Sequence, residues 1–316
     1  MSKAILRAVL LAAALAGGGV ASAQPGAAPA VSPAPSPAAP DFSKVTITTT
    51  DLGHATYMLQ GQGGNITVAV GGDGVIMVDS QFAPLHDKIK AAVAALTPLP
   101  ILYVVNTHFH GDHSGGDAAF AADGAVVVAQ ANVKSRLAAG TVSGLTGAVN
   151  PPLTGAALPS RIFQGALTVT VKDRAARLRH YPNAHTDGDT YVYFPDADVL
   201  STGDIVISGR YPNIDVAYGG TIKGMIGATE ALLALAGPNT KIVPGHGPLM
   251  TKADMQAYHD LLVSARDRVA VLVAAGKSED EAIAAKPLAD LDAKVGAAPQ
   301  ASANFTRVIY RSLKPA

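Results

Sequence analysis

The sequence contains no cysteine among its 316 residues. This absence excludes disulfides, thiolate metal ligands and cysteine nucleophiles together, so any metal must be held by histidine and carboxylate side chains. It does not identify a redox compartment, because a chain that is long enough to bury a large core needs no covalent cross-links.

An excess of charge of one sign is also lacking, since 24 Lys and Arg balance 24 Asp and Glu. Without a single-sign field, the composition argues against nucleic acid and anionic membranes as partners. Charged residues make up only 15% of the chain and hydrophobic residues 48%, so a sizeable core is expected, in one large domain or two average ones. We expect a small-molecule substrate, and no protein partner is evident.

The N-terminal apolar run is shorter than the roughly 20 residues that cross a bilayer. Lys3 and Arg7 precede its core and Ala21-Ser22-Ala23 follows it, which is the three-part pattern of a secretory signal peptide. We therefore expect residues 1–23 to be removed, no stable membrane insertion after this cleavage, and a periplasmic or secreted protein. Residues 24–44 are rich in Ala and Pro and are predicted to form a flexible linker.

Internal repeats and a Gly-x-Ser-x-Gly elbow are absent, which argues against solenoids, propellers and a serine hydrolase. A glycosidase is not supported either, because two carboxylates mean little without geometry. Short β-rich runs and glycine-rich turns open the chain as an antiparallel segment, and two similar halves of strands and helices indicate an αβ/βα sandwich. Strands are predicted at 45–48, 66–70, 75–78, 101–105, 125–129, 166–171, 191–194, 199–200 and 241–243, helices at 87–96, 116–122, 221–235 and most of 254–316, and a long loop at 140–159.

Three histidines and an aspartate follow the strand predicted at 101–105, in the run His108-Phe109-His110-Gly111-Asp112-His113. Side chains of such a turn can converge on one point. Zinc favours imidazole and carboxylate ligands, and a catalytic zinc site keeps one position for water. Local spacing cannot complete the site, so further ligands must come from distant loops that follow strands. The candidates are His185, Asp204 and His246.

The pattern His-x-His-x-Asp-His, followed in order by a loop His, a Gly-Asp and a Gly-His-Gly, resembles the metallo-β-lactamase superfamily over roughly residues 45–266. The resemblance implies a four-layer αβ/βα sandwich at 45–265 with a C-terminal helical extension at 266–316. It also implies two zinc ions. By this resemblance His108, His110 and His185 hold the first ion, Asp112, His113 and His246 hold the second, Asp204 bridges both, and Asp79 is a carboxylate that orients a ligand.

Two adjacent ions lower the pKa of a bridging water towards about 7, so the resemblance implies hydrolysis with Asp112 and Asp204 orienting the water. We expect an exported zinc-dependent hydrolase that cleaves an acyl C–O or C–N bond in a β-lactam, lactone or ester. One zinc subclass has cysteine in place of Asp204 and a substrate-binding lysine three residues on, where this chain has Ile207. Substrate recognition is therefore expected from another set of side chains, namely Arg210, Tyr211, Asn213 and Tyr218.

The alternatives are a mononuclear iron dioxygenase, a thioester hydrolase of the same superfamily, and a non-catalytic accessory module. Export argues against the enzymes of this superfamily that act on glutathione thioesters or persulfides, because those substrates are cytosolic. The complete ligand set argues against a non-catalytic accessory module. The other histidines show no partner pattern and are predicted to be structural or superficial. They are His54, His86, His180 and His259.

Overall fold

The computed structural model describes residues 41–144 and 147–314. The predicted signal peptide and the predicted linker up to residue 40 lie outside these described residues, and the short 3-10 helix η1 (Phe42–Lys44) begins the described part. Within these ranges no helix is both long enough and apolar enough to cross a membrane.

The first sheet has seven strands in the order β1-β2-β3-β4-β5-β6-β9. Strands β1 to β4 pair antiparallel, which confirms the predicted antiparallel opening, and β4, β5, β6 and β9 pair parallel. All four residues of β4 are buried, as expected for a strand covered on both faces. The strands are β1 (Thr48–Gly53), β2 (Thr56–Gln60), β3 (Ile66–Val70), β4 (Val75–Val78), β5 (Ile101–Val105), β6 (Val126–Gln130) and β9 (Arg161–Phe163).

The second sheet has five strands in the order β10-β11-β12-β13-β14. Its first four strands pair antiparallel, and β14 pairs parallel with β13. A small hairpin of β7 (Thr141–Val142) and β8 (Val149–Asn150) lies in the region predicted as a long loop. The strands of the second sheet are β10 (Ala166–Val171), β11 (Arg174–His180), β12 (Thr190–Phe194), β13 (Val199–Ser201) and β14 (Lys241–Val243).

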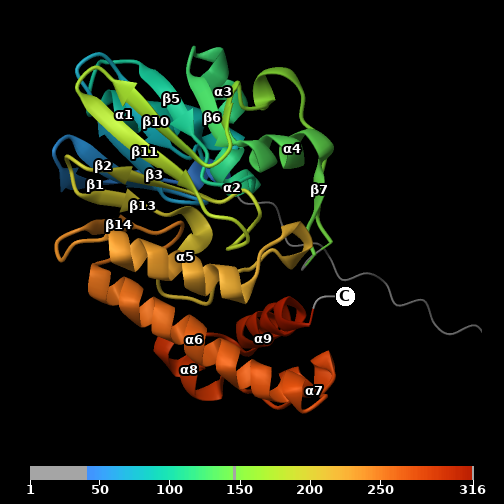
Figure 1. The fold of residues 1–316 in the computed structure, drawn as a ribbon. Helices are drawn as coiled ribbons and strands as arrows, with labels where there is room; N and C mark the ends of the chain where they lie inside the picture. Colours follow the sequence, from blue (N-terminus) through green and yellow to red (C-terminus); the bar gives the residue numbers. More distant parts are fainter. Residues whose placement is uncertain (1–40, 145–146, 315–316) are drawn as a thin grey trace, which may run out of the picture. The chain divides into compact units, whose positions relative to one another are not determined.

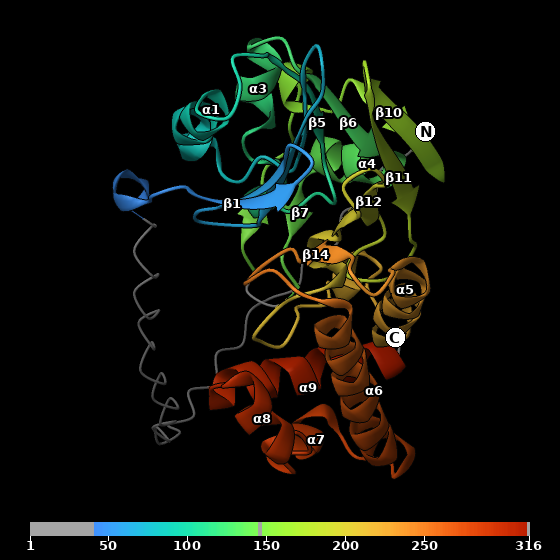
Figure 2. The same ribbon diagram turned by 90° about the vertical axis from the view of Figure 1, so that its left-hand side faces the viewer.

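The two sheets face each other across an apolar core to which both contribute, for example Ile76 and Val105 from the first and Phe194 and Val199 from the second. Helices cover the two outer faces, as Figures 1 and 2 show, and the predicted four-layer αβ/βα sandwich is confirmed. On the first sheet lie α1 (His86–Ala94) and α3 (Asp117–Ala122), with α2 (Gly111–Ser114) and α4 (Ala131–Ala139) near its carboxyl edge, and on the second sheet lies α5 (Ile222–Leu235).

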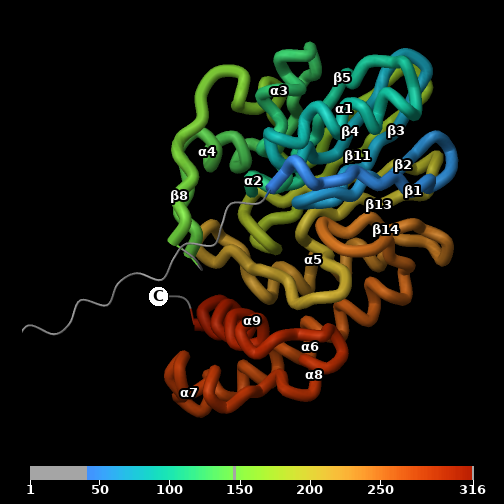
Figure 3. The backbone as a smooth tube through the Cα atoms, turned by 180° about the vertical axis from the view of Figure 1, so that it is seen from behind, coloured from blue at the N-terminus to red at the C-terminus, as the bar shows by residue number. Residues whose placement is uncertain are grey.

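The C-terminal helices pack together beyond α5, on its side away from the sheets (Figure 3). A reciprocal capping box of Thr251 and Asp254 starts the long helix α6. The domain boundary predicted at residue 265 falls inside this helix. The predicted helical extension is present. Its helices are α6 (Lys252–Ala274), α7 (Glu279–Ala284), α8 (Ala289–Val295) and α9 (Pro299–Leu313).

Short 3-10 helices complete the described chain. Two of them, η4 (Gly203–Ile205) and η5 (Val216–Tyr218), lie in the loops that follow β13. The others are η2 (Ala83–Leu85) and η3 (Gly155–Ala157).

Candidate metal centre

The predicted ligands lie beyond strand ends that share one edge of the sandwich. Asp79 follows β4 and His108 follows β5, and these strands are parallel neighbours. His185 follows β11, Asp204 follows β13 and His246 follows β14. Since β11 and β13 both run antiparallel to β12, and β14 runs parallel to β13, their carboxyl ends also lie at one edge of the second sheet. The topology therefore brings residues from both halves of the chain together.

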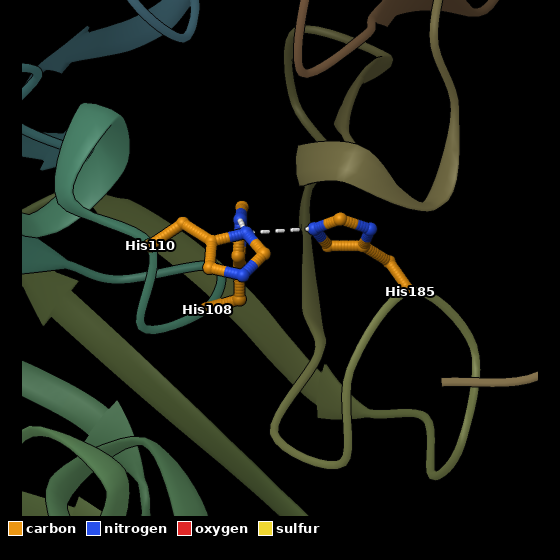
Figure 4. Close-up of side chains that lie close together, drawn as sticks. All are labelled: His108, His110 and His185. Carbon is orange, nitrogen blue, oxygen red and sulfur yellow. Dashed lines mark hydrogen bonds between the residues drawn. The ribbon is translucent and has the colours of Figure 1, made fainter. Parts of the chain in front are cut away.

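Three imidazoles form the first group. His110 Nδ1 lies 3.1 Å from His108 Nε2 and 2.9 Å from His185 Nε2, and Figure 4 shows the three rings pointing at one another. His108 and His185 are each 1% exposed. A tetrahedral zinc ion with Zn–N bonds of about 2.0–2.1 Å separates its ligands by about 3.3 Å, so the spacing of these nitrogens is close to that of a metal site.

The second group combines a carboxylate with two imidazoles. His246 Nε2 lies 3.2 Å from Asp112 Oδ2 and 3.3 Å from His113 Nε2. Asp112 Oδ2 is 3.8 Å from His113 Nε2. All three ligand atoms thus lie within one small volume, as in the first group.

Asp204 lies between the two groups. Its Oδ2 is 3.6 Å from His185 Nε2 in the first group, and its Oδ1 is 3.2 Å from His113 Nε2 and 3.4 Å from His246 Nε2 in the second. One oxygen therefore faces each group, which is the placement that a bridging carboxylate requires.

Carboxylates outside the two groups fix the rings. Asp79 Oδ2 lies 2.7 Å from His113 Nδ1, and Asp79 in turn accepts hydrogen bonds from the backbone N–H and the hydroxyl of Thr107. Asp79 has a φ of 66°, a conformation that costs energy in a non-glycine residue and is typical of functional sites. Asp215 Oδ2 lies 2.9 Å from His110 Nε2, an interaction that the sequence did not predict. These contacts leave the opposite nitrogen of each ring directed into the cluster.

The cluster divides into uncharged and charged parts. Burial lowers the pKa of His108 well below its usual value and that of His185 to about 4. Burial also opposes charge on His113 and His246, yet the carboxylate of Asp204 raises the pKa of both, that of His246 to about 9. His108 and His185 of the first group are thus uncharged imidazoles at neutral pH, the form that binds metals.

Imidazoles are the basic partners of the carboxylates in the cluster. In residues 41–144 and 147–314, Asp79, Asp112 and Asp204 form ion pairs with histidines and none with Lys or Arg. The buried Oδ1 of Asp204 makes no hydrogen bond of acceptable geometry. Imidazole nitrogen with carboxylate oxygen is the donor set of divalent metals such as zinc, and a bound cation would offset the cost of burying these carboxylates. The residues therefore fit metal ions.

Two glycines allow the backbone to approach the cluster, and the sequence alone did not single them out. A Cβ on Gly245 would lie 2.0 Å from Asp204 Oδ1, and a Cβ on Gly64 would lie 2.2 Å from Cε1 of His113. Any side chain at these positions would displace a ligand. In the sequence, this close approach of the backbone is indicated only by the glycine next to His246 and by the glycine-rich turn at 61–65.

A cavity of about 510 Å³ adjoins the cluster, a size suited to a small molecule. His110 and Asp112 line it, and so do Asn213 and Tyr218, as predicted for two of the substrate-binding candidates. Asp215 also lines it. The β7–β8 hairpin, η5 and α9 contribute to its walls. Its other lining residues are Phe82, Phe109, Gly111, Thr141, Ser143, Gly144, Asn150, Ile214, Val216, Ala217, Val308 and Arg311.

Arg210 and Tyr211, the other two predicted substrate-binding residues, do not line this cavity. Arg210 lines a separate cavity between the loop at 208–210, α6 and α8. Tyr211 is 7% exposed, donates its hydroxyl to Asp292 Oδ1 at 2.8 Å and stacks on Phe305 with ring centroids 4.7 Å apart. The chain turns these two side chains towards the C-terminal helices, so Tyr211 anchors the extension.

The side chains of three of the four remaining histidines have partners outside the cluster. His86 lies between Asp87 and Asp123, His180 Nδ1 lies 2.8 Å from the carbonyl of Asp189, and His259 contacts Glu230 and Asp260. His54 lies in the β1–β2 turn and belongs to no metal-ligand group of the described residues.

Asp215→Ala is expected to weaken metal binding by about 10–100-fold, because His110 loses the partner that orients its ring. Asp215→Asn keeps an acceptor but not the charge, so we expect a smaller loss. Competition with a chromophoric chelator measures both affinities, with Asp87→Asn on the surface of α1 as control. Equal affinities in all four proteins would show that Asp215 plays no part in metal binding.

Comparisons with known proteins agree with this geometry. The sequence model of the Metallo-beta-lactamase superfamily matches residues 59–246. The acyl-coenzyme A thioesterases MBLAC2 of Bos taurus and Homo sapiens are 31% identical over 179 residues, which are 51% of this chain and 61% of their length. The 2,4-dinitroanisole O-demethylase subunit alpha of Nocardioides sp. (strain JS1661) is 28% identical over 62% of this chain and 56% of its own. The chain thus spans about three fifths of these curated relatives.

Solved structures show the same fold at lower identity. A metallo-beta-lactamase from Pontibacter korlensis is 18% identical, with a TM-score of 0.57 over 69% of this chain and 99% of that one. The DIM-1 metallo-beta-lactamase is 15% identical, with a TM-score of 0.57 over 70% of this chain and 100% of its own. At these identities the likeness establishes the arrangement of layers and strands, and not the substrate.

Proposed function

The chain belongs to the metallo-beta-lactamase superfamily, and on that premise we propose that it is an exported hydrolase that binds two zinc ions and cleaves an acyl C–O or C–N bond. One observation carries the proposal: two groups of metal-ligating side chains, joined by Asp204, lie next to a cavity of about 510 Å³. Ester, lactone and β-lactam bonds are the substrates we propose. Export is supported by Lys3, Arg7 and the small residues before Gln24.

In this proposal His108, His110 and His185 hold one ion, Asp112, His113 and His246 hold the other, and Asp204 contacts both. Bound zinc would lower the pKa of a water molecule towards about 7 and polarise the substrate carbonyl. A carboxylate that contacts the outer nitrogen of a ring fixes the orientation of that ring, as Asp79 does for His113.

The side chains that touch the cavity have separate tasks. Burial raises the pKa of Asp112, but His113 and His246 together outweigh this effect and lower the pKa to about 2, so the carboxylate is ionised at neutral pH. With Oδ2 of Asp112 facing the second group, its other carboxylate oxygen would accept a hydrogen bond from the attacking water and orient it towards the carbonyl carbon. The cavity walls would hold that carbon next to the water. The two reactants are then already positioned, so the entropy cost of bringing them together in solution is avoided.

Thioester hydrolysis is the second candidate function. The acyl-coenzyme A thioesterases that match this chain favour it, although the match covers only 61% of their length. A thioester carbonyl needs the same water and the same polarisation as an ester, so the site itself accommodates both.

A substrate panel tests the proposal. Protein is recovered from the exported fraction, where we expect Gln24 as the first residue, and assayed with zinc against lactones, β-lactams, aryl esters and acyl thioesters. We expect hydrolysis of at least one acyl class, loss of that activity on treatment with a chelator, and recovery with zinc. A protein that begins at Met1, or that hydrolyses none of these bonds, would contradict export or hydrolysis respectively. One equivalent of iron would favour the dioxygenase alternative.

A further inference from the structure

The cavity beside the metal centre has a wall that comes from outside the region that the superfamily model matches. Val308 and Arg311 of α9 line it, whereas the match ends at residue 246. We infer that Arg311 binds an anionic group of the substrate, so that the enzyme selects acyl compounds that carry a carboxylate or a phosphate. This inference rests on the proposed hydrolase function and names its substrate class.

Arg311 is the one Lys or Arg side chain among the described residues that line this cavity. Arg210, which the sequence favoured for this role, lies at another cavity. Arg136 lines a neighbouring recess of about 300 Å³, but Asp187 neutralises it through a contact of 2.5 Å. The cationic side chain that the sequence led us to expect from Arg210 is thus supplied by Arg311 of the C-terminal helix α9.

The charge around Arg311 is only partly compensated. Glu279 accepts hydrogen bonds from Nε and Nη2 of Arg311 at 2.8 and 3.0 Å and from Nε of Arg307 at 3.1 Å. Two guanidinium groups therefore share one carboxylate, which leaves one positive charge. Nη1 of Arg311 has no partner within the described residues, so it is a donor available to a ligand. Guanidinium binds carboxylate and phosphate through charge-assisted hydrogen bonds.

The position of α9 relative to the cavity is fixed by several contacts. The hydroxyl of Ser312 accepts a hydrogen bond of 2.8 Å from the backbone N–H of Ile222 at the start of α5. Tyr310 donates its hydroxyl to the carbonyl of Lys277 at 2.8 Å, and Phe305 stacks on Tyr211. The residues on either side of Arg311 are therefore anchored, and the Glu279 pair directs its guanidinium. A pre-positioned cation loses less entropy when it binds an anion.

A matched pair of esters tests the inference. 4-Nitrophenyl hemiglutarate and 4-nitrophenyl pentanoate have acyl chains of similar length, but only the first carries a carboxylate. For Arg311→Gln we expect kcat/KM for the hemiglutarate to fall about tenfold, mainly through KM, because an exposed charged hydrogen bond is lost. The pentanoate should change less than about twofold, and Arg311→Lys should recover part of the preference.

Arg266→Gln is the control, because Arg266 pairs with Asp267 on α6, does not contact Glu279 and does not line the cavity. It should leave the preference between the two esters unchanged. An equal loss on both esters in Arg311→Gln, or an equal change of preference in Arg266→Gln, would overturn the inference.

Binding of glutarate to the zinc-loaded protein, measured by calorimetry, separates this inference from the proposed function. We expect its Kd to rise about tenfold in Arg311→Gln whether or not the esters are hydrolysed. Hydrolysis of neither ester together with this rise would count against the proposed function alone. An unchanged Kd would overturn the role of Arg311.

Discussion

His185→Ala is expected to remove one metal ion and to lower kcat/KM for hydrolysis by roughly 10³-fold. The substitution leaves the first group with two imidazoles, and a catalytic metal contributes several kcal/mol of transition-state stabilisation, of which about 4 kcal/mol corresponds to this factor. The loop itself should stay in place, because Asp189 accepts the backbone N–H of residue 185 at 2.6 Å and that of Thr186 at 2.8 Å. Steady-state kinetics and metal analysis of the same preparation measure both losses.

His259→Ala is the control for this prediction. His259 contacts Glu230 and Asp260 at the surface of α5 and α6 and does not belong to the metal-ligand groups of the described residues. It should keep full metal content and activity. A His185→Ala protein that binds as much metal and hydrolyses as fast as the control would refute the assignment of the first group.

Phe305→Ala is expected to lower the free energy of unfolding by about 3–5 kcal/mol, the usual cost of removing a buried phenyl ring. Phe305 is 2% exposed and stacks on Tyr211 with an interplanar angle of 23°. For a chain of this size, such a loss lowers the thermal midpoint by about 6–20 °C. Calorimetry measures the midpoint, and Gln300→Ala, an exposed position on the same helix, is the control.

Tyr211→Phe separates the two roles considered for Tyr211. It keeps the stack on Phe305 and removes the hydrogen bond to Asp292, so we expect a loss of about 1–2 kcal/mol in stability and no change in KM. A higher KM with unchanged stability would instead support the substrate-binding role that was predicted from the sequence. An unchanged midpoint in Phe305→Ala would show that the extension does not depend on this stack.

The sequence predicted the ligand cluster because its chemistry is local and ordered. Within His108–His113 the residue types and their spacing already indicate a metal site, and each distant candidate follows a strand end. All seven predicted ligands, together with Asp79, converge in the structure. Asp215 could not be found in this way, because its contact with His110 depends on how the loop after β13 folds back across the cavity, and no local pattern encodes that path.

Strand β11 shows why part of the fold was missed. The run Arg174 to Arg177 contains two alanines and two arginines, which favour a helix, yet it pairs with β10 and β12. Ala176 and Leu178 point into the core between the sheets, whereas Arg177 and Arg179 are exposed. Pairing and burial on one face outweigh local propensity here.

The side chains of Arg210 and Tyr211 lie away from the cavity beside the cluster for a related reason. Loop residues after a bridging carboxylate commonly face the substrate, and the sequence does not show that a helical extension packs against this loop. In the structure the extension takes Tyr211 as an anchor and contributes Arg311 to the cavity. The part of the site that sets substrate selection thus lies outside the motifs that identify the superfamily.

The metal content of the purified protein decides whether the cluster is a dinuclear zinc site. The protein is loaded with zinc, dialysed against metal-free buffer and subjected to elemental analysis by mass spectrometry. We expect about two zinc ions per chain, because the ligands form two groups joined by Asp204. Absence of bound zinc, or one iron ion per chain in protein purified without added metal, would contradict this expectation.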